Sequence, residues 1–211
     1  MKNIYWKIWI NFWCFLAWLD GAGKDKKKDA VDWIQGDPEY SVYDTSKIVV
    51  IGDSSANHFC QRLQRYWEVT PLSKTYGFIK NYARNGVPID YFIKPNPDGL
   101  NFNTVIIMVG GNNIGLFDED VDTVVKKHFD LYKLLPANKK IVVGLSPFNG
   151  TEGFSPWKNK IIKEVNDKLK MIYGDEFIDV FPSEMLPSFT DGVHHTYHYD
   201  LQIIKNVLYK L

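Results

Sequence analysis

The run Ile48-Val-Val-Ile51, which ends at Gly52-Asp-Ser54, constrains the fold of this chain most strongly. An unbroken β-branched run is typical of a strand that is buried on both faces of a sheet. Further strands are predicted at 78–82, 104–109, 140–145 and 177–181, with helices from Ser54 to about 67 and over about 120–135, 156–173 and 196–211. Strands that alternate with helices predict an α/β fold of three layers, in which helices cover both faces of a five-stranded parallel sheet.

The N-terminal residues differ in character from this domain. Lys2 and Lys7 precede a mostly apolar run over 8–19, so residues 1–23 are predicted to be a signal peptide or a membrane-associated segment. The run is shorter than the roughly 20 residues that cross a bilayer, and a helix docked on the domain is the alternative. We expect export to the periplasm, the medium or a membrane surface, with membrane association through residues 4–19. Residues 24–46 are a polar linker, and the domain spans 47–211.

Composition excludes several classes of partner. Lys plus Arg and Asp plus Glu both total 25, so the overall charge does not favour binding to nucleic acid. The two cysteines, Cys14 and Cys60, have neither the number nor the spacing of a disulfide framework or a zinc site. Cys60 is expected to be a lone buried thiol.

Residues of types that can take part in catalysis follow several different predicted strands. Ligands bind beyond the carboxyl ends of the strands in a parallel sheet, and Ser54, Gly86, Asn112 and Asp191 with His194 all fall at that edge. Ester acyl transfer needs such a set: a nucleophile, a base, an acid that orients the base, and donors for the oxyanion.

Each of these residues also has an ordinary structural explanation. Ser54 could simply cap a helix, Asp191 could cap the last helix, and Gly86 and Asn112 are common turn residues. His194, His195 and His198 share a helix face and could bind a metal, but no acidic or cysteine ligand accompanies them at a usual spacing.

Taken together, the segments Ile51–Ser54, Asn81–Gly86, Val109–Asn112 and Asp191–His194 resemble the sequence blocks of the SGNH (GDSL-type) hydrolase superfamily, in the same order. The resemblance implies a flavodoxin-like fold and a serine esterase without metal or organic cofactor. It implies that Ser54 is the nucleophile, that His194 is its base, and that Asp191 orients His194. The N–H groups of Ser54 and Gly86 and the side chain of Asn112 would form the oxyanion hole, while Asp53 braces the turn.

The sequence departs from this pattern in three places. Asn113 stands where many members have aspartate, and His195 stands where proline is common. The residues that follow Ser54, up to His58, are also not the usual continuation of the first block.

The substrate is predicted only as a class. No long apolar insertion follows a strand, which favours a short acyl group such as acetyl. Phe148, Phe154 and Trp157 could stack on a sugar of a carbohydrate or cell-envelope ester, or pack locally. Two alternatives remain open: an O-acyltransferase that uses the same site, and a non-catalytic flavodoxin-like binding module, which would not explain why Asp191 and His194 accompany Ser54. The oligomeric state is not indicated.

Overall fold

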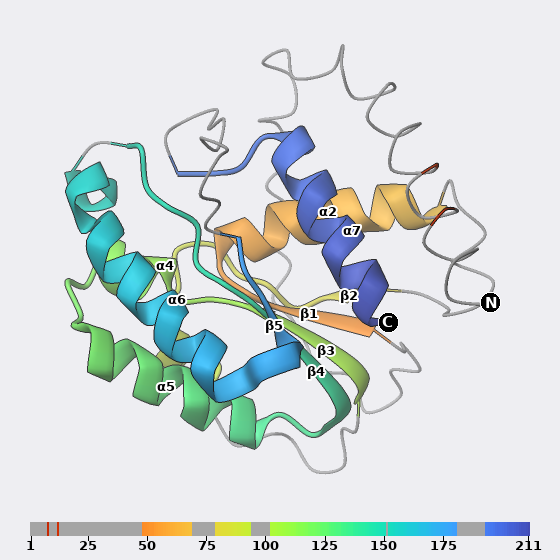
Figure 1. Ribbon diagram of the computed structural model, residues 1–211, viewed down its shortest axis with the longest axis horizontal. Helices are drawn as coiled ribbons and strands as arrows, with labels where there is room; N and C mark the ends of the chain where they lie inside the picture. The colour runs from red at the N-terminus through yellow and green to blue at the C-terminus, as the bar shows by residue number, and fades with distance from the viewer. Residues whose placement is uncertain are drawn as a thin grey trace.

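The computed structural model describes residues 8, 12, 48–68, 79–93, 102–150, 152–180 and 193–211. Its α-helices (α), 3-10 helices (η) and strands (β) alternate along the domain as predicted (Figure 1). In chain order they are β1 (Ile48–Gly52), α2 (Ser54–Glu68), β2 (Ile79–Asn81), η1 (Ile89–Tyr91), β3 (Phe102–Met108), α4 (Gly111–Gly115), α5 (Val121–Leu134), β4 (Ala137–Val143), η2 (Glu152–Phe154), η3 (Pro156–Lys158), α6 (Asn159–Tyr173), η4 (Gly174–Glu176), β5 (Phe177–Ile178) and α7 (Tyr197–Lys210).

The strands form one five-stranded parallel sheet in the order β2-β1-β3-β4-β5. Within it, Val50 of β1 pairs with Asn81 on one side and Ile106 on the other. The strand order reverses at β1, because β2 lies on one side of it and β3 on the other. Such a switch point leaves a crevice beyond the carboxyl ends of the two diverging strands, and ligands bind there in open α/β sheets.

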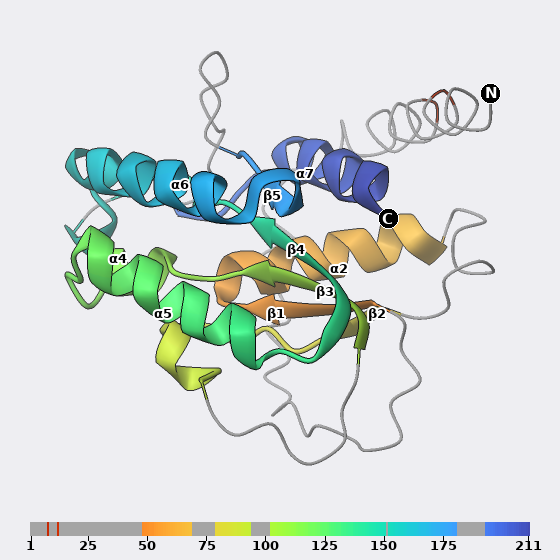
Figure 2. The same ribbon diagram turned by 60° about the horizontal axis from the view of Figure 1, so that its bottom comes forward.

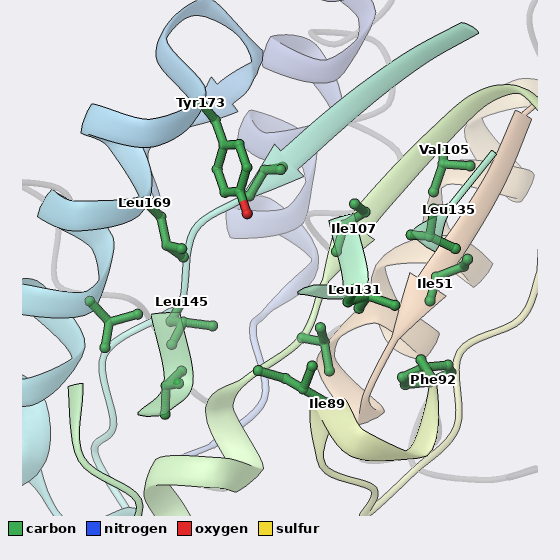
Figure 3. Packing of buried hydrophobic residues seen from close by; sticks show 14 of the residues in the cluster. Ile51, Ile89, Phe92, Val105, Ile107, Leu131, Leu135, Leu145, Leu169 and Tyr173 are labelled. Carbon is green, nitrogen blue, oxygen red and sulfur yellow. The ribbon is translucent and has the colours of Figure 1, made fainter. Parts of the chain in front are cut away.

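Helices cover both faces of the sheet, as Figures 1 and 2 show. Ile48 and Val50 of β1 pack in one apolar cluster with α2 and α7, while Val49 and Ile51 pack in a second cluster with α5 and α6. Figure 3 shows part of the second cluster, including Tyr173 of α6. The two-sided burial explains why the run at β1 is apolar without alternation. The three-layer α/β fold with a parallel sheet is therefore confirmed.

The bounds of some elements differ from the prediction. β4 begins at Ala137 rather than at 140, because its exposed polar start pairs with the start of β3 and the backbone N–H of Phe102 donates to the carbonyl of Pro136. β5 comprises only Phe177–Ile178. The short helix α4 was not predicted, since glycine and asparagine have low helix propensity.

The predicted N-terminal segment, 1–23, and the linker, 24–46, lie outside the described residues apart from Ile8 and Phe12. Among the residues that are described, no helix has the length and apolar character needed to cross a membrane. Cys60 is buried as expected, and burial raises the pKa of its thiol far above the usual range.

His128 gives the fold a predictable response to acid. It is fully buried, its Nδ1 lies 3.1 Å from the Tyr173 hydroxyl, and burial lowers its pKa to about 4. The unfolded chain, with a histidine pKa near 6.5, binds this proton more readily, so stability present at neutral pH is lost as the pH falls from about 6.5 towards 4. We expect His128 to account for a loss of about 2 kcal/mol in unfolding free energy between pH 7 and pH 5.

Urea unfolding of the wild type and of His128→Gln at both pH values measures this contribution. The variant keeps a polar group near Tyr173 but does not titrate, so its stability should fall by about 2 kcal/mol less. Equal losses in the two proteins would contradict the assignment.

Candidate active site

Ser54 is the first residue of α2 and directly follows the turn at the end of β1. The carboxylate of Asp53 accepts a hydrogen bond from the backbone N–H of Ser55 at 3.0 Å, which is the bond that a helix N-cap makes. Asp53 therefore caps α2, and the expectation that it braces the turn is confirmed, whereas the alternative in which Ser54 merely caps the helix is not. Burial raises the pKa of Asp53, while backbone hydrogen bonds and the charge of His194 act in the opposite direction.

His194 lies next to this serine, although the two are 140 residues apart in the chain. Its Nε2 is 2.8 Å from Ser54 Oγ, the distance expected between a serine nucleophile and its base. The ring of His58, one helical turn after Ser54, lies against the His194 ring with 4.6 Å between the ring centroids. His58 therefore restricts the orientation of His194 from the side of α2.

Hydrogen bonds between asparagine side chains join the loop after β2 to α2. The side chain of Asn57 accepts a hydrogen bond from Asn81 at 2.7 Å and donates one to Asn85 at 3.2 Å. Gly86 lies in the same turn with a φ of 72°, a conformation that disfavours residues with a Cβ. A Cβ at Gly86 would meet nothing within 4 Å, so the backbone conformation, rather than lack of space, favours glycine at this position.

Asn112 joins the loop after β2 to the loop after β3. It is buried in α4, and its Nδ2 donates to the carbonyl of Val87 at 3.0 Å. The adjacent Asn113 is fully buried, accepts from the backbone N–H of Ile89 and donates to the carboxylate of Glu119, both at 3.0 Å. An aspartate at 113 would set a second carboxylate against Glu119, which explains this departure from the family pattern.

These loops line a shallow cleft at the carboxyl edge of the sheet. Phe148 and Phe154 form an aromatic wall with their ring centroids 5.0 Å apart in an edge-to-face arrangement. Trp157 does not line the cleft and is 67% exposed. The cleft is lined by Asp53, Ser54, Ser55, Met108, Val109, Gly111, Asn112, Gly144, Leu145, Ser146, Phe148, Phe154 and Val193.

His194 and His195 do not converge on one point. His194 faces Ser54, whereas the buried His195 hydrogen-bonds to Ser146 through Nε2 and to Asp200 through Nδ1. The rings of His194 and His195 are directed to different serines and so do not share a metal site, while the side chain of His198 lies outside what the structure describes.

The structure thus brings Ser54 and His194 together and sets Ser54 and Asn112 on one cleft, with Gly86 in the neighbouring loop. Asp191 lies outside the described residues. Sequence reasoning did not assign the contacts of Asn57, His58, Ser146 and His195. Only His58 carried a usable signal, since a residue four positions after Ser54 on a helix lies on the same face.

No protein-family model and no curated protein matches the chain. Solved structures do resemble it. A carbohydrate esterase family 3 protein from Talaromyces cellulolyticus is 17% identical, with a TM-score of 0.57 over 77% of this chain and 94% of that one. A member of the lipolytic protein G-D-S-L family from Veillonella parvula is 19% identical, with a TM-score of 0.51 over 76% of this chain and 95% of that one. A carbohydrate acetylesterase family member from Sinorhizobium meliloti is 14% identical, with a TM-score of 0.52 over 78% of this chain and all of that one. The chain therefore has the α/β fold of the GDSL-type (SGNH) hydrolases, as the sequence resemblance predicted.

Proposed function

We propose that this protein is a serine esterase that hydrolyses short-chain acyl esters, foremost O-acetyl esters of carbohydrate or cell-envelope substrates, through an acyl-enzyme on Ser54. The observation that carries the proposal is the 2.8 Å separation between Ser54 Oγ and His194 Nε2. Ser54 also lies on the cleft and at the N-terminus of a 15-residue helix, where backbone N–H groups and the helix dipole favour negative charge.

In the proposed reaction, His194 Nε2 takes the proton of Ser54 as Oγ attacks the ester carbonyl carbon. The N–H groups of Ser54 and Gly86 and the amide of Asn112 would stabilise the oxyanion. The Asn112 amide has two hydrogens, and its bond to Val87 needs only one of them.

His194 then gives the proton to the leaving alcohol and activates a water molecule, which releases the acid from Ser54. We assign Asp191 to hold the Nδ1 side of His194, as its place three residues before the histidine suggests. No step requires a metal or an organic cofactor.

Two features support a small acyl group and a glycan ester. The aromatic wall of Phe148 and Phe154 lines a small cleft, and such walls also suit the apolar face of a sugar. The structural neighbours include proteins described as a carbohydrate esterase and a carbohydrate acetylesterase. We also propose export through residues 1–23, because their basic start and apolar run resemble a signal peptide. Export would give the enzyme access to cell-envelope esters.

Hydrolysis of p-nitrophenyl esters from acetyl to octanoyl tests the proposal. We expect activity on the acetate that falls steadily with chain length, and labelling by a fluorophosphonate at Ser54. Rising activity towards octanoate would contradict the short-acyl assignment. Neither hydrolysis nor labelling would favour the binding-module alternative.

A further inference from the structure

A second serine on the same cleft is hydrogen-bonded to a histidine. Ser146 follows β4, lines the cleft, and shares a hydrogen bond with Nε2 of His195. His195 Nδ1 lies 2.9 Å from Asp200 Oδ1 in α7. The other carboxylate oxygen of Asp200 accepts from Arg62 in α2 at 2.6 Å, and Arg62 also donates to the His195 carbonyl at 2.8 Å.

The proton positions in this network follow from its chemistry. Asp200 and His195 are buried, and Arg62 lies 2.6 Å from the carboxylate of Asp200 and balances its charge. A carboxylate only accepts hydrogen bonds, so Nδ1 of His195 carries the hydrogen. The single hydroxyl hydrogen of Ser146 is used in either arrangement of this network: it is donated to Nε2 of His195, or it is donated to the Tyr199 oxygen while Nε2 donates to the Ser146 oxygen.

The oxygen of Ser146 is thereby fixed as a hydrogen-bond acceptor. The nearby hydroxyl of Tyr199 donates its own hydrogen to the carbonyl of Val180 and so does not donate to Ser146. Ser146 is only partly buried, and it lines the cleft that also holds Ser54. A ligand in this cleft would therefore meet a lone pair held in a set direction.

We propose that Ser146, held by His195, Asp200 and Arg62, accepts a hydrogen bond from a free hydroxyl on the alcohol part of the substrate. This inference rests on the proposed esterase function and narrows its substrates to partly acylated polyols such as sugars. An acetyl group carries no donor, so the donor belongs to the alcohol. A site whose polar group is hydrogen-bonded only by the correct substrate discriminates strongly against analogues that lack the hydrogen-bond donor.

The geometry disfavours a second nucleophile at Ser146. Ser54 begins a long helix whose N–H groups can stabilise an oxyanion, whereas Ser146 lies in a segment without regular structure that runs to residue 150. The groups suited to receive developing negative charge are thus at Ser54.

Three acetates compared on the full chain test the inference. Methyl β-D-xylopyranoside monoacetate keeps free hydroxyls, its triacetate has none, and p-nitrophenyl acetate has neither sugar nor hydroxyl. For Ser146→Ala we expect kcat/KM on the monoacetate to fall about 10- to 100-fold, the effect of one lost hydrogen bond in a desolvated site. Activity on the triacetate and on p-nitrophenyl acetate should change by less than about threefold. Ser146→Thr, which keeps the hydroxyl, should restore most of the preference.

Other results would overturn the inference and can be told apart. Equal losses on all three acetates would mean that Ser146 only supports the structure, and no loss on any would mean that it is not used. Fluorophosphonate labelling of Ser146 in the Ser54→Ala variant would make it a nucleophile instead. If the wild type hydrolyses none of the acetates, the proposed function itself fails and this inference falls with it.

Discussion

Ser54→Ala is expected to lower kcat for p-nitrophenyl acetate by about 10⁴- to 10⁶-fold while the protein remains folded. The variant removes the atom that would form the acyl-enzyme, and no other group described near His194 replaces that oxygen at 2.8 Å. Loss of one half-buried hydroxyl on the cleft leaves the packing of β1 and α2 intact. Steady-state kinetics together with a thermal melt measure the two effects separately.

The same mechanism predicts strong non-additivity. His194→Ala should be impaired to a similar degree, and the double variant should be little worse than either single one, because the two residues act as a unit. Ser155→Ala, which removes a serine hydroxyl with no role in capping η3, serves as the matched control and should keep wild-type activity. Multiplicative losses in the double variant would exclude a shared step.

The sheet and the position of the site could be predicted because both depend on local patterns. The run at β1 is apolar throughout because both of its faces are buried, and a two-residue period would have indicated one solvated face. In a parallel sheet, the ends of the strands then bring Ser54 and Asn112 to one edge without knowledge of the contacts. Asp191 and the N-terminal segment remain predictions.

The contacts that support the site could not be predicted, because they join distant parts of the chain. His195 was noted only as a departure from a common proline, whereas it connects α2, α7 and the loop after β4 through Arg62, Asp200 and Ser146. Nothing local in the sequence specifies such partners, and the same holds for the asparagine network at Asn57. Side-chain networks of this kind depend on the packing of complete layers.

Of the substitutions discussed, Gly52→Ala is expected to destabilise the protein most, with a loss of about 3–5 kcal/mol in unfolding free energy. A Cβ at this position would lie 1.8 Å from the carbonyl oxygen of Met108 and 2.5 Å from the Cβ of Ala56. The first of these is a backbone atom of the neighbouring strand, and it also accepts a hydrogen bond from the backbone N–H of Asp53 at 3.3 Å. It cannot move aside as a flexible side chain could, so β1 and β3 would have to separate where Ser54 leaves the sheet.

Gly174→Ala provides the matched control, because it has a φ of 53° but no atom within 4 Å of a Cβ. Its φ of 53° and ψ of −120° are a combination that L residues rarely adopt, so it should lose about 1–3 kcal/mol from backbone strain alone. The difference in unfolding free energy between the two variants, measured with urea, separates the cost of the steric clash from that of backbone strain. The kcat/KM of the folded protein then reports whether Ser54 has been displaced. If Gly52→Ala were as stable and as active as Gly174→Ala, the close approach of β1 to β3 would not be what holds Ser54 beside His194. The expected result, a large loss of stability with a further loss of activity in the protein that remains folded, would show that the position of the nucleophile depends on the close contact between β1 and β3.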